Sequence, residues 1–265
     1  AAGTGRPCYN LDYHTMTEDE IIGTFAHHGA DADISVIEGN KGLFDGLDLD
    51  GANSNAALAT LLGAPVVLIV DAVGMTRGVA PLILGYQTFD PEMCLAGVIL
   101  NRIGGSRHEA KLKRIIEHYT DVPVIGSVHR HPALEIAERH LGLIPSNEAA
   151  DAQATIEAIT DIVADQVDLQ CIRDIAATAS PVTASVGAAV PTVAADVRIA
   201  IARDSAFGFY YPDDLRALEA AGAELVPFDT LFDDRLPDAD GLFIGGGFPE
   251  SHLVALESNV SLRQQ

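Results

Sequence analysis

Short apolar runs alternate with amphipathic stretches from residue 17 to residue 165, and this alternation predicts an α/β fold. The stretches between the runs carry apolar residues near helical period, and several open on Ser, Thr or Asn, the residues that cap helices. Four runs are β-branched and apolar enough to be central strands, at 34–38, 66–71, 95–101 and 123–128. We therefore expect a parallel sheet with helices on both faces.

The pattern breaks between residues 175 and 195, where an uncharged segment contains two prolines. Such a composition predicts a linker. The α/β alternation then starts again, with strands expected at 197–202, 223–228 and 240–247 and a helix from about residue 212 to 221. We predict a first domain over 1–167, a helix and linker over 168–196, and the start of a second domain over 197–265.

Composition narrows the class of protein. The 265 residues are 48% hydrophobic, too apolar for disorder, and they carry 38 acidic against 16 basic side chains, a net charge of −22. Nucleic acid needs clustered cations, so we expect no such partner, and any basic site must be local. No stretch is apolar enough for a membrane span or a signal peptide, which predicts a cytoplasmic protein without a membrane partner. Three widely spaced cysteines predict reduced thiols.

The first candidate site follows the run 34–38. This run ends in Glu38 and continues into a glycine-rich loop that carries Asp45 seven residues later. Open α/β sheets bind ligands at the carboxyl edge, and two carboxylates there suit Mg²⁺, with water and phosphate completing its shell. Alternatively, the acidic residues of this loop are solvated turn residues, with glycine supplying the positive φ angles.

Two further strand ends carry polar side chains. Asp71 precedes a small-residue turn and a helix whose N-terminus, with Arg77, suits an anion, although a capped helix start explains the same residues. Asn101 offers a donor and an acceptor to a ligand such as an adenine edge, or lies in an ordinary turn. No GxxxxGK[ST] phosphate-binding loop occurs, and we expect that loop and a first strand upstream of Ala1.

The candidate chemistry of the second part lies at Gly245, Gly246 and Gly247, directly after an apolar run. Consecutive glycines let backbone N–H groups converge on an anion, as an oxyanion hole requires, whereas a plain tight turn needs only one or two of them. No Ser or Cys on a strand-to-helix elbow follows, so we expect the nucleophile outside these residues. Four aromatic residues within 207–211 pack as core, pack the two domains together or form a face for a flat ligand.

These motifs resemble the cobyrinate a,c-diamide synthase family. The similar segments keep the family's order along almost the whole chain: NLD (10–12), VIEGNKGLFDG (36–46), VVLIVDAVGMTRG (66–78), FDPEMCLAGVILNR (89–102), PVIGSV (123–128), ERHLGLI (138–144), DSAFGFYYPDDL (204–215) and GGGFPE (245–250). The resemblance implies a P-loop-type domain like that of dethiobiotin synthetase, followed by a flavodoxin-like class I glutamine amidotransferase domain. It also implies a ligase that uses MgATP and glutamine to amidate the a and c acetate groups of cobyrinate or hydrogenobyrinate through an acyl phosphate.

The resemblance also implies roles for single residues. Glu38 would coordinate Mg²⁺, Asp45 would lie beside the reacting carboxylate and phosphate, and Gly245–Gly247 would line the oxyanion hole of the glutaminase. Lys41 and Arg77 are candidates for the cations that compensate a polycarboxylate. The full set expected to bind nucleotide and anions is Lys41, Asp71, Arg77, Asn101 and Arg102. The family's P-loop and cysteine nucleophile fall outside these residues, which by themselves are expected to be inactive.

Two alternatives stay open. Lys41 in EGNKG stands where corrinoid enzymes more often have an apolar residue, which is similar to homologues that amidate sirohaem, so sirohaem or nickel sirohydrochlorin is an alternative substrate. An alternative of another class is a non-catalytic partner protein that binds nucleotide like a partition ATPase, although such proteins lack a GGGFPE domain. The sequence also leaves a homodimer possible.

Overall fold

The computed structural model describes residues 3–136, 138–139, 142–143, 152–182 and 193–265. The chain divides into a larger unit, made of Leu11–Glu135 and Glu157–Gly187, and a smaller unit, made of Ala1–Asn10, Ile136–Ile156 and Ala188–Gln265. Both units are α/β with parallel sheets, which confirms the predicted fold class. Of the predicted helix-and-linker segment 168–196, residues 183–192 lie outside the described residues.

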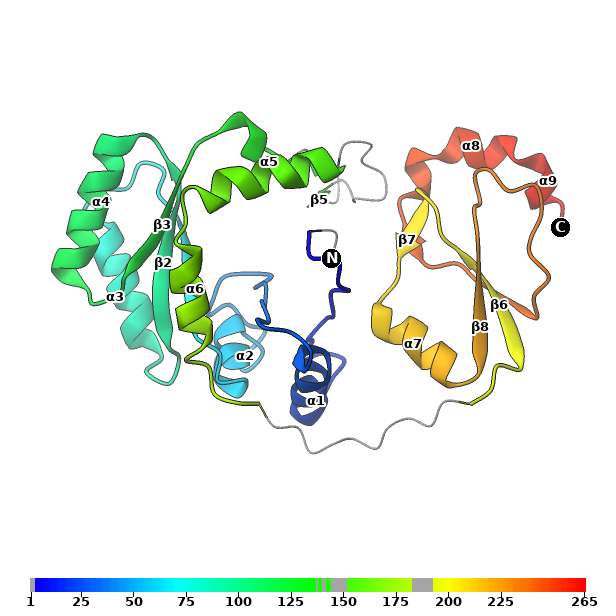
Figure 1. The fold of residues 1–265 in the computed structure, drawn as a ribbon, viewed down its shortest axis with the longest axis horizontal. Helices are drawn as coiled ribbons and strands as arrows, with labels where there is room; N and C mark the ends of the chain where they lie inside the picture. Colours follow the sequence, from blue (N-terminus) through cyan, green and yellow to red (C-terminus); the bar gives the residue numbers. More distant parts are fainter. Residues whose placement is uncertain (1–2, 137, 140–141, 144–151, 183–192) are drawn as a thin grey trace. The chain divides into compact units, whose positions relative to one another are not determined.

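The larger unit is built on three parallel strands in the order β1-β2-β3, of which β2 and β3 are labelled in Figure 1. These strands are three of the four predicted from the apolar runs. The elements from the start of the chain to the end of this unit are α1 (Glu18–Gly29), α2 (Asn55–Leu61), β1 (Val66–Asp71), α3 (Val79–Phe89), β2 (Leu95–Ile103), α4 (Ser106–Tyr119), β3 (Val124–His129), η1 (Pro132–Leu134), α5 (Ala152–Ala164), which continues from the smaller unit, and α6 (Leu169–Ala176).

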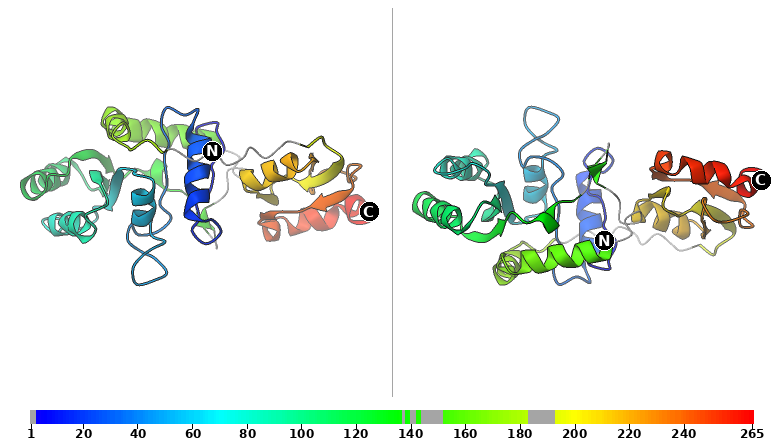
Figure 2. Two further views of the ribbon diagram at one scale, coloured as in Figure 1. Left: turned by 90° about the horizontal axis from the view of Figure 1, so that it is seen from below. Right: turned by 90° about the horizontal axis from the view of Figure 1, so that it is seen from above.

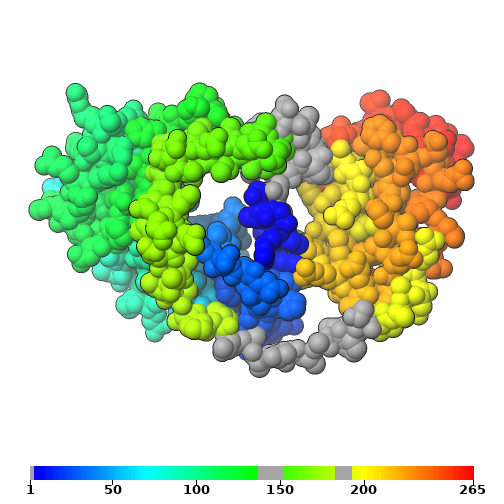
Figure 3. Space-filling model, viewed as in Figure 1, coloured from blue at the N-terminus to red at the C-terminus, as the bar shows by residue number. Residues whose placement is uncertain are grey.

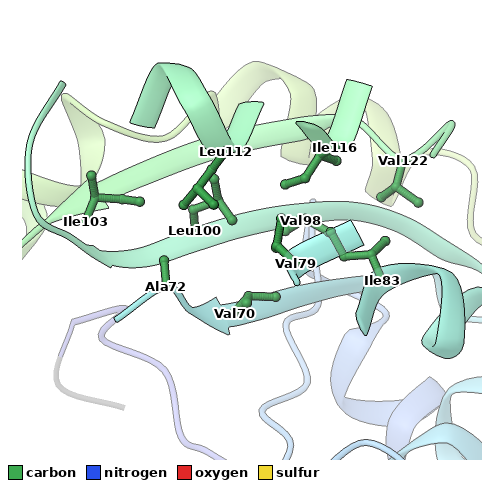
Figure 4. Packing of buried hydrophobic residues seen from close by; sticks show 10 residues of the cluster. All are labelled: Val70, Ala72, Val79, Ile83, Val98, Leu100, Ile103, Leu112, Ile116 and Val122. Carbon is green, nitrogen blue, oxygen red and sulfur yellow. The ribbon is translucent and has the colours of Figure 1, made fainter. Parts of the chain in front are cut away.

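Helices cover both faces of this sheet, as predicted. The inner sides of α3 and α4 bury Ile83, Leu112 and Ile116 against Val98 and Leu100 of β2 (Figure 4). Side chains alternate along a strand, and a Cβ on Gly97, which lies on the other face, would meet Ile175 of α6 at 3.3 Å. Each fully buried branched aliphatic side chain contributes roughly 1.5–3 kcal/mol, so this core is the main source of the unit's stability.

Two of the predicted helix starts carry side-chain caps. Thr17 accepts a hydrogen bond from the Glu20 backbone N–H, and the Glu20 carboxylate accepts one from the Thr17 N–H, which completes a capping box for α1. Ser54 accepts a hydrogen bond from the Ala57 N–H and begins α2 in the same way. These polar residues therefore fix where the two helices begin, as the sequence predicted.

The predicted strand at 34–38 is wrong. This run forms no strand, and its Val36 side chain is 86% exposed. A strand requires a neighbour to take up its backbone hydrogen bonds, and in the described part of the chain β1 is paired with β2 alone. Apolar composition is thus not enough to make this run a strand without a pairing edge.

The smaller unit has its own parallel sheet in the order β8-β6-β9 and a two-stranded antiparallel pair, β7 with β10. Ala200, Ala202 and Phe228 form its buried cluster, with Phe207 and Leu262 packed against them. The remaining elements are β4 (Glu138–Arg139), β5 (Gly142–Leu143), β6 (Val197–Ala202), β7 (Phe207–Phe209), α7 (Pro212–Ala220), β8 (Ala223–Phe228), β9 (Gly241–Phe243), β10 (Gly246–Gly247), η2 (Pro249–Ser251), α8 (Leu253–Ser258) and α9 (Val260–Arg263).

The sequence predictions for this unit hold with one refinement. The strands at 197–202 and 223–228 and the helix near 212–221 form as expected. The single run predicted at 240–247 divides into β9 and β10, which pair with different partners. In the space-filling view, the yellow-to-red part of the chain packs closely into one body (Figure 3). Among the described residues, no helix is long and apolar enough to cross a membrane.

Candidate functional site

The carboxyl ends of β1 and β2 bring three of the predicted site residues together. Asp71 lies opposite Asn101 in the register of the two strands, and the Arg102 guanidinium contacts the Asp71 carboxylate at 2.9 Å. The Asn101 Oδ1 atom accepts a hydrogen bond of 2.8 Å from the Arg102 backbone N–H. These side chains therefore form one polar cluster at the sheet edge where ligands of such folds bind.

Arg102 holds this cluster with a strained backbone. Its φ angle is 60°, in the left-handed region that favours glycine. Such a conformation costs on the order of 1–3 kcal/mol and concentrates at functional sites. The Asp71 and Arg102 side chains are 54% and 58% exposed, so their ion pair contributes little to stability and both groups are accessible to a ligand. The Asn101 amide nitrogen has no hydrogen bond in the described part of the chain and is available as a donor.

Arg77 belongs to a different surface. Its guanidinium lies 5.2 Å from the centre of the Tyr119 ring and lines an open groove along α4, together with Arg107, Lys111 and Arg114. The groove has a volume of about 990 Å³, and within the described residues none of these four cations has an ion-pair partner. A basic site was predicted to be local, and this groove brings together four of the larger unit's cations, with Glu117 also in its lining.

Glu38, Lys41 and Asp45 precede α2 on a segment without helix or strand, and all three are exposed. The light-blue chain just before α2 projects from the larger unit as a loop (Figure 2). The loop is shaped by its own side chains: Asn53 Oδ1 accepts from the Leu47 N–H at 2.8 Å, and the Asn55 amide donates to the Lys41 carbonyl at 2.9 Å. The Asp45 carboxylate fills the space that a Cβ on Gly42 would take, so any larger residue at position 42 would displace this side chain.

The other contacts of this loop differ from the sequence expectation. Phe44 packs against Tyr86 and Phe89, with ring centres 5.6 and 4.8 Å apart, on the last turn of α3. A helix that follows a parallel strand runs back along the sheet, so its last turn lies toward the amino edge rather than the carboxyl edge. In the described residues no contact joins Glu38 or Asp45 to the cluster of Asp71, Asn101 and Arg102. Because 34–38 is not a strand, nothing anchors the loop at the carboxyl edge.

The donor set of the loop nevertheless suits Mg²⁺. Glu38 and Asp45 are exposed carboxylates without an ion-pair partner in the described part of the chain, and Mg²⁺ takes one or two carboxylates together with water and phosphate oxygens. No group of three or more His, Cys, Asp and Glu residues able to hold a metal occurs among the described residues. The chain's own ligands therefore suit a cation that is completed by a bound phosphate.

A charged cluster that the sequence did not single out lies at the end of β3. Glu109 accepts hydrogen bonds from the Lys113 ammonium at 2.7 Å and is 2.8 Å from His129 Nε2. The Lys113 hydrogen bond, with a smaller contribution from His129, lowers the pKa of Glu109 against the opposing effect of burial. The i,i+4 spacing of Glu109 and Lys113 is visible in the sequence, whereas the contact with His129 required the fold.

The glycine segment of the smaller unit is closely packed. A Cβ on Gly247 would fall on the Ala206 carbonyl oxygen, and one on Gly246 would lie 3.2 Å from Phe209 Cβ. At Gly245 a Cβ would fall on Cε1 of Tyr210 and lie 2.7 Å from its Cζ, against one edge of the ring. Packing against Tyr210 thus requires Gly245, and packing against the backbone that enters β7 requires Gly247. These two glycines have a steric cause besides the predicted oxyanion role.

Tyr210 is one of the aromatic residues of 207–211, whose role the sequence left open. Its hydroxyl donates to the Ala202 carbonyl at 2.5 Å and accepts from the Gly245 N–H at 2.9 Å. Burial raises the pKa of Tyr210 above its ordinary value, so the hydroxyl keeps its proton. The ring meets Phe243 edge-on, while Phe209 meets Phe248. These contacts agree with the interpretation that the aromatic residues pack as core within the unit.

Two protein families match consecutive parts of the chain. An AAA domain family matches residues 10–138, and a CobB/CobQ-like glutamine amidotransferase domain family matches residues 198–265. These are the two domain types that the motifs implied, in the predicted order.

Curated relatives match almost the whole chain. The cobyrinate a,c-diamide synthase of Magnetococcus marinus is 43% identical over 96% of this chain, and the chain covers 56% of that protein. The enzymes of that name from Methanosarcina acetivorans and Listeria innocua are 43% and 40% identical over 98% of the chain, which covers 55% and 58% of them. The chain thus spans about half the length of these relatives, and the resemblance drawn from the motifs is confirmed. No solved structure gives a significant match.

Proposed function

Because this chain is related over nearly its whole length to cobyrinate a,c-diamide synthases, we propose that the protein containing it is an ATP- and glutamine-dependent amidoligase. Its substrate is a tetrapyrrole with acetate side chains, cobyrinate in the first place. The relationship to enzymes of that name along both units carries the proposal, and the amidotransferase match at 198–265 distinguishes it from a partition-ATPase-like partner protein.

The proposed chemistry activates a carboxylate that is otherwise a poor electrophile. An oxygen of the substrate carboxylate attacks the γ-phosphorus of ATP, ADP leaves, and an acyl phosphate forms. Ammonia released from glutamine then attacks the acyl carbon, phosphate leaves, and the nitrogen loses a proton to give the amide. Mg²⁺, when bound, neutralises the charge of the phosphates.

The chain's own residues divide between holding nucleotide and placing substrate. We assign Asn101 to the nucleotide base, with Asp71 and Arg102 as the adjoining polar groups at the same sheet edge. The accessible strained cluster at the ends of β1 and β2 supports this assignment.

We assign the loop that precedes α2 in the sequence to binding the reacting groups. Glu38 is the Mg²⁺ ligand and Asp45 lies beside the reacting carboxylate, while Lys41 and Arg77 compensate the negative charge of a polycarboxylate. The support for the last pair is their exposure in a protein of net charge −22, together with the unpaired cations that surround Arg77. In the smaller unit, Gly246 and Gly247 are the oxyanion donors of the glutaminase.

The experiment uses the full-length protein that contains this chain. It is incubated with ATP, Mg²⁺ and glutamine and with cobyrinate, sirohaem or nickel sirohydrochlorin, and the products are weighed by mass spectrometry. Each amidation replaces a hydroxyl by an amino group, so two successive small losses of mass are expected with cobyrinate. If these mass losses occur with sirohaem or nickel sirohydrochlorin and not with cobyrinate, that tetrapyrrole is the substrate instead. Hydrolysis of ATP without formation of any amide would refute the proposed reaction.

Asp45→Asn tests the assignment within the loop. We expect it to abolish amidation and to leave glutamine hydrolysis intact, because the two reactions use different units. Asp50→Asn is the matched control, since Asp50 is an exposed carboxylate of the same loop without a described hydrogen bond. Equal activity of the two variants would remove Asp45 from the site.

A further inference from the structure

We propose that Tyr210 is a positioning residue of the glutaminase centre: its hydroxyl fixes the glycine segment so that the N–H groups of Gly246 and Gly247 are held toward the oxyanion. This inference rests on the proposed function, because it presumes that these two glycines serve glutamine hydrolysis. It adds a residue that never touches the substrate and acts through the backbone that does.

The hydroxyl of Tyr210 joins two parts of the unit that are distant in sequence. It donates to the carbonyl of Ala202, the last residue of the central strand β6, and it accepts from the N–H of Gly245 at 2.9 Å. The first bond, at 2.5 Å, anchors the hydroxyl to a fully buried strand end. The second bond transfers that fixed position to the residue before Gly246.

The hydrogen bond between the Gly245 N–H and the Tyr210 hydroxyl also distinguishes the roles of the three glycines. The Gly245 N–H is already used by Tyr210, so it is not available to stabilise an oxyanion. Gly246 and Gly247 follow directly and form the short strand β10, paired with β7. Of the three glycines predicted for the oxyanion hole, the first is thus a structural anchor. The oxyanion role stays assigned to Gly246 and Gly247, which pair with β7 across a register shift.

Close packing makes the anchor stiff. The Tyr210 ring occupies the place of a side chain on Gly245, and its edge meets Phe243 with ring centres 5.3 Å apart. At the other end of the segment, the Ala206 carbonyl occupies the place of a side chain on Gly247. Contact with the ring prevents the segment from shifting toward Tyr210, and the hydroxyl, together with the pairing of β10 with β7, opposes a shift away.

This arrangement matters because oxyanion donors act by preorganisation. Donors stabilise the developing charge only when they are about 2.7–3.1 Å from the oxygen in the transition state. A misplacement of about 1 Å at a catalytic group costs on the order of a hundredfold in rate. Loss of the anchor should therefore lower kcat for glutamine hydrolysis and leave the binding of glutamine nearly unchanged.

The test compares Tyr210→Phe with Tyr211→Phe in the full-length enzyme. Both changes delete one phenolic hydroxyl, but Tyr211 is 58% exposed and its hydroxyl has no described partner, so it is the matched control. For Tyr210→Phe we expect glutaminase kcat to fall by roughly ten- to a hundredfold with little change in KM. Amidation driven by added ammonium chloride should remain at the wild-type rate, and hydrogen exchange should quicken at 245–247.

Each other result overturns the inference. Wild-type glutaminase kcat in Tyr210→Phe would show that the hydroxyl positions nothing, and an equal loss with glutamine and with ammonia would show a merely structural role. If Tyr210→Phe does not fold, Gly245→Ala, which displaces the ring and keeps the hydroxyl, must give the same selective loss of glutamine-driven activity. The proposed function fails separately, if the wild-type enzyme itself neither hydrolyses glutamine nor forms amide.

Discussion

Gly247 tests whether packing by itself requires a glycine in the segment 245–247. We consider the substitution Gly247→Ala, which adds one methyl group facing backbone atoms rather than flexible side chains. The new Cβ would fall on the Ala206 carbonyl oxygen, 2.8 Å from the carbon of that carbonyl and 2.9 Å from Phe207 Cα. No change of rotamer relieves such contacts, so β10 must separate from β7.

The cost of this separation follows from the contacts. Overpacking typically costs about 1–3 kcal/mol, and contact with backbone on this scale places Gly247→Ala at the upper end. A loss of about 3 kcal/mol lowers the folding equilibrium constant of the unit about a hundredfold. Gly241→Ala is the control, because a Cβ there meets nothing within 4 Å and the φ angle is not positive. It should change stability by less than about 1 kcal/mol, in the stabilising direction.

Urea denaturation followed by hydrogen exchange in the peptides of 197–265 measures both variants within the smaller unit. We expect Gly247→Ala to unfold at a clearly lower urea concentration than Gly241→Ala. Equal midpoints would refute the packing argument. Loss of glutaminase activity at unchanged stability would then assign Gly247 to the chemistry alone.

Three further changes probe the larger unit. Ile116→Ala should lower the free energy of unfolding by about 2–5 kcal/mol in urea titrations, because Ile116 is fully buried in the core, whereas Leu47→Ala on the exposed loop should have almost no effect. Because the pKa of Glu109 is lowered, its ionised form stabilises the fold above the ordinary carboxylate pKa, and this contribution is lost as pH falls through the lowered pKa. In thermal melts from neutral to acidic pH, the difference in stability between wild type and Glu109→Gln should therefore decrease to zero. Thr17→Ala removes the cap of α1 and should speed hydrogen exchange in that helix, with a cost of about 1 kcal/mol, and an unchanged exchange rate would contradict the capping argument.

Local chemistry made much of the fold predictable. The apolar runs at β1, β2, β3, β6 and β8 became strands because each has a neighbouring strand in the described chain. Thr17 and Ser54 begin their helices because each needs only N–H groups two or three residues away. The ordered motifs also indicated the family, since their identity and spacing are properties of the chain alone.

The candidate site was predictable only where strand pairing fixed it. Asp71 ends β1 and Asn101 lies near the end of the neighbouring β2, so the sequence placed them together. The ion pair to Arg102 depends on a backbone angle that no pattern predicts. The predicted position of Glu38 and Asp45 depended on a strand at 34–38, and an apolar run forms no strand without a neighbouring strand to pair with.

The sequence by itself determined the α/β class, most of the order of the elements and the caps of the first helices, and it proposed the residues for metal, anion or base. Only the tertiary structure decided that Arg77 joins the cations of α4, that Phe44 packs on the end of α3, and that Tyr210 takes the Gly245 N–H. The physical reason is range. Periodicity, propensity and capping act within a few residues, whereas these contacts join residues 30 to 45 positions apart, and only the packed backbone brings them within reach.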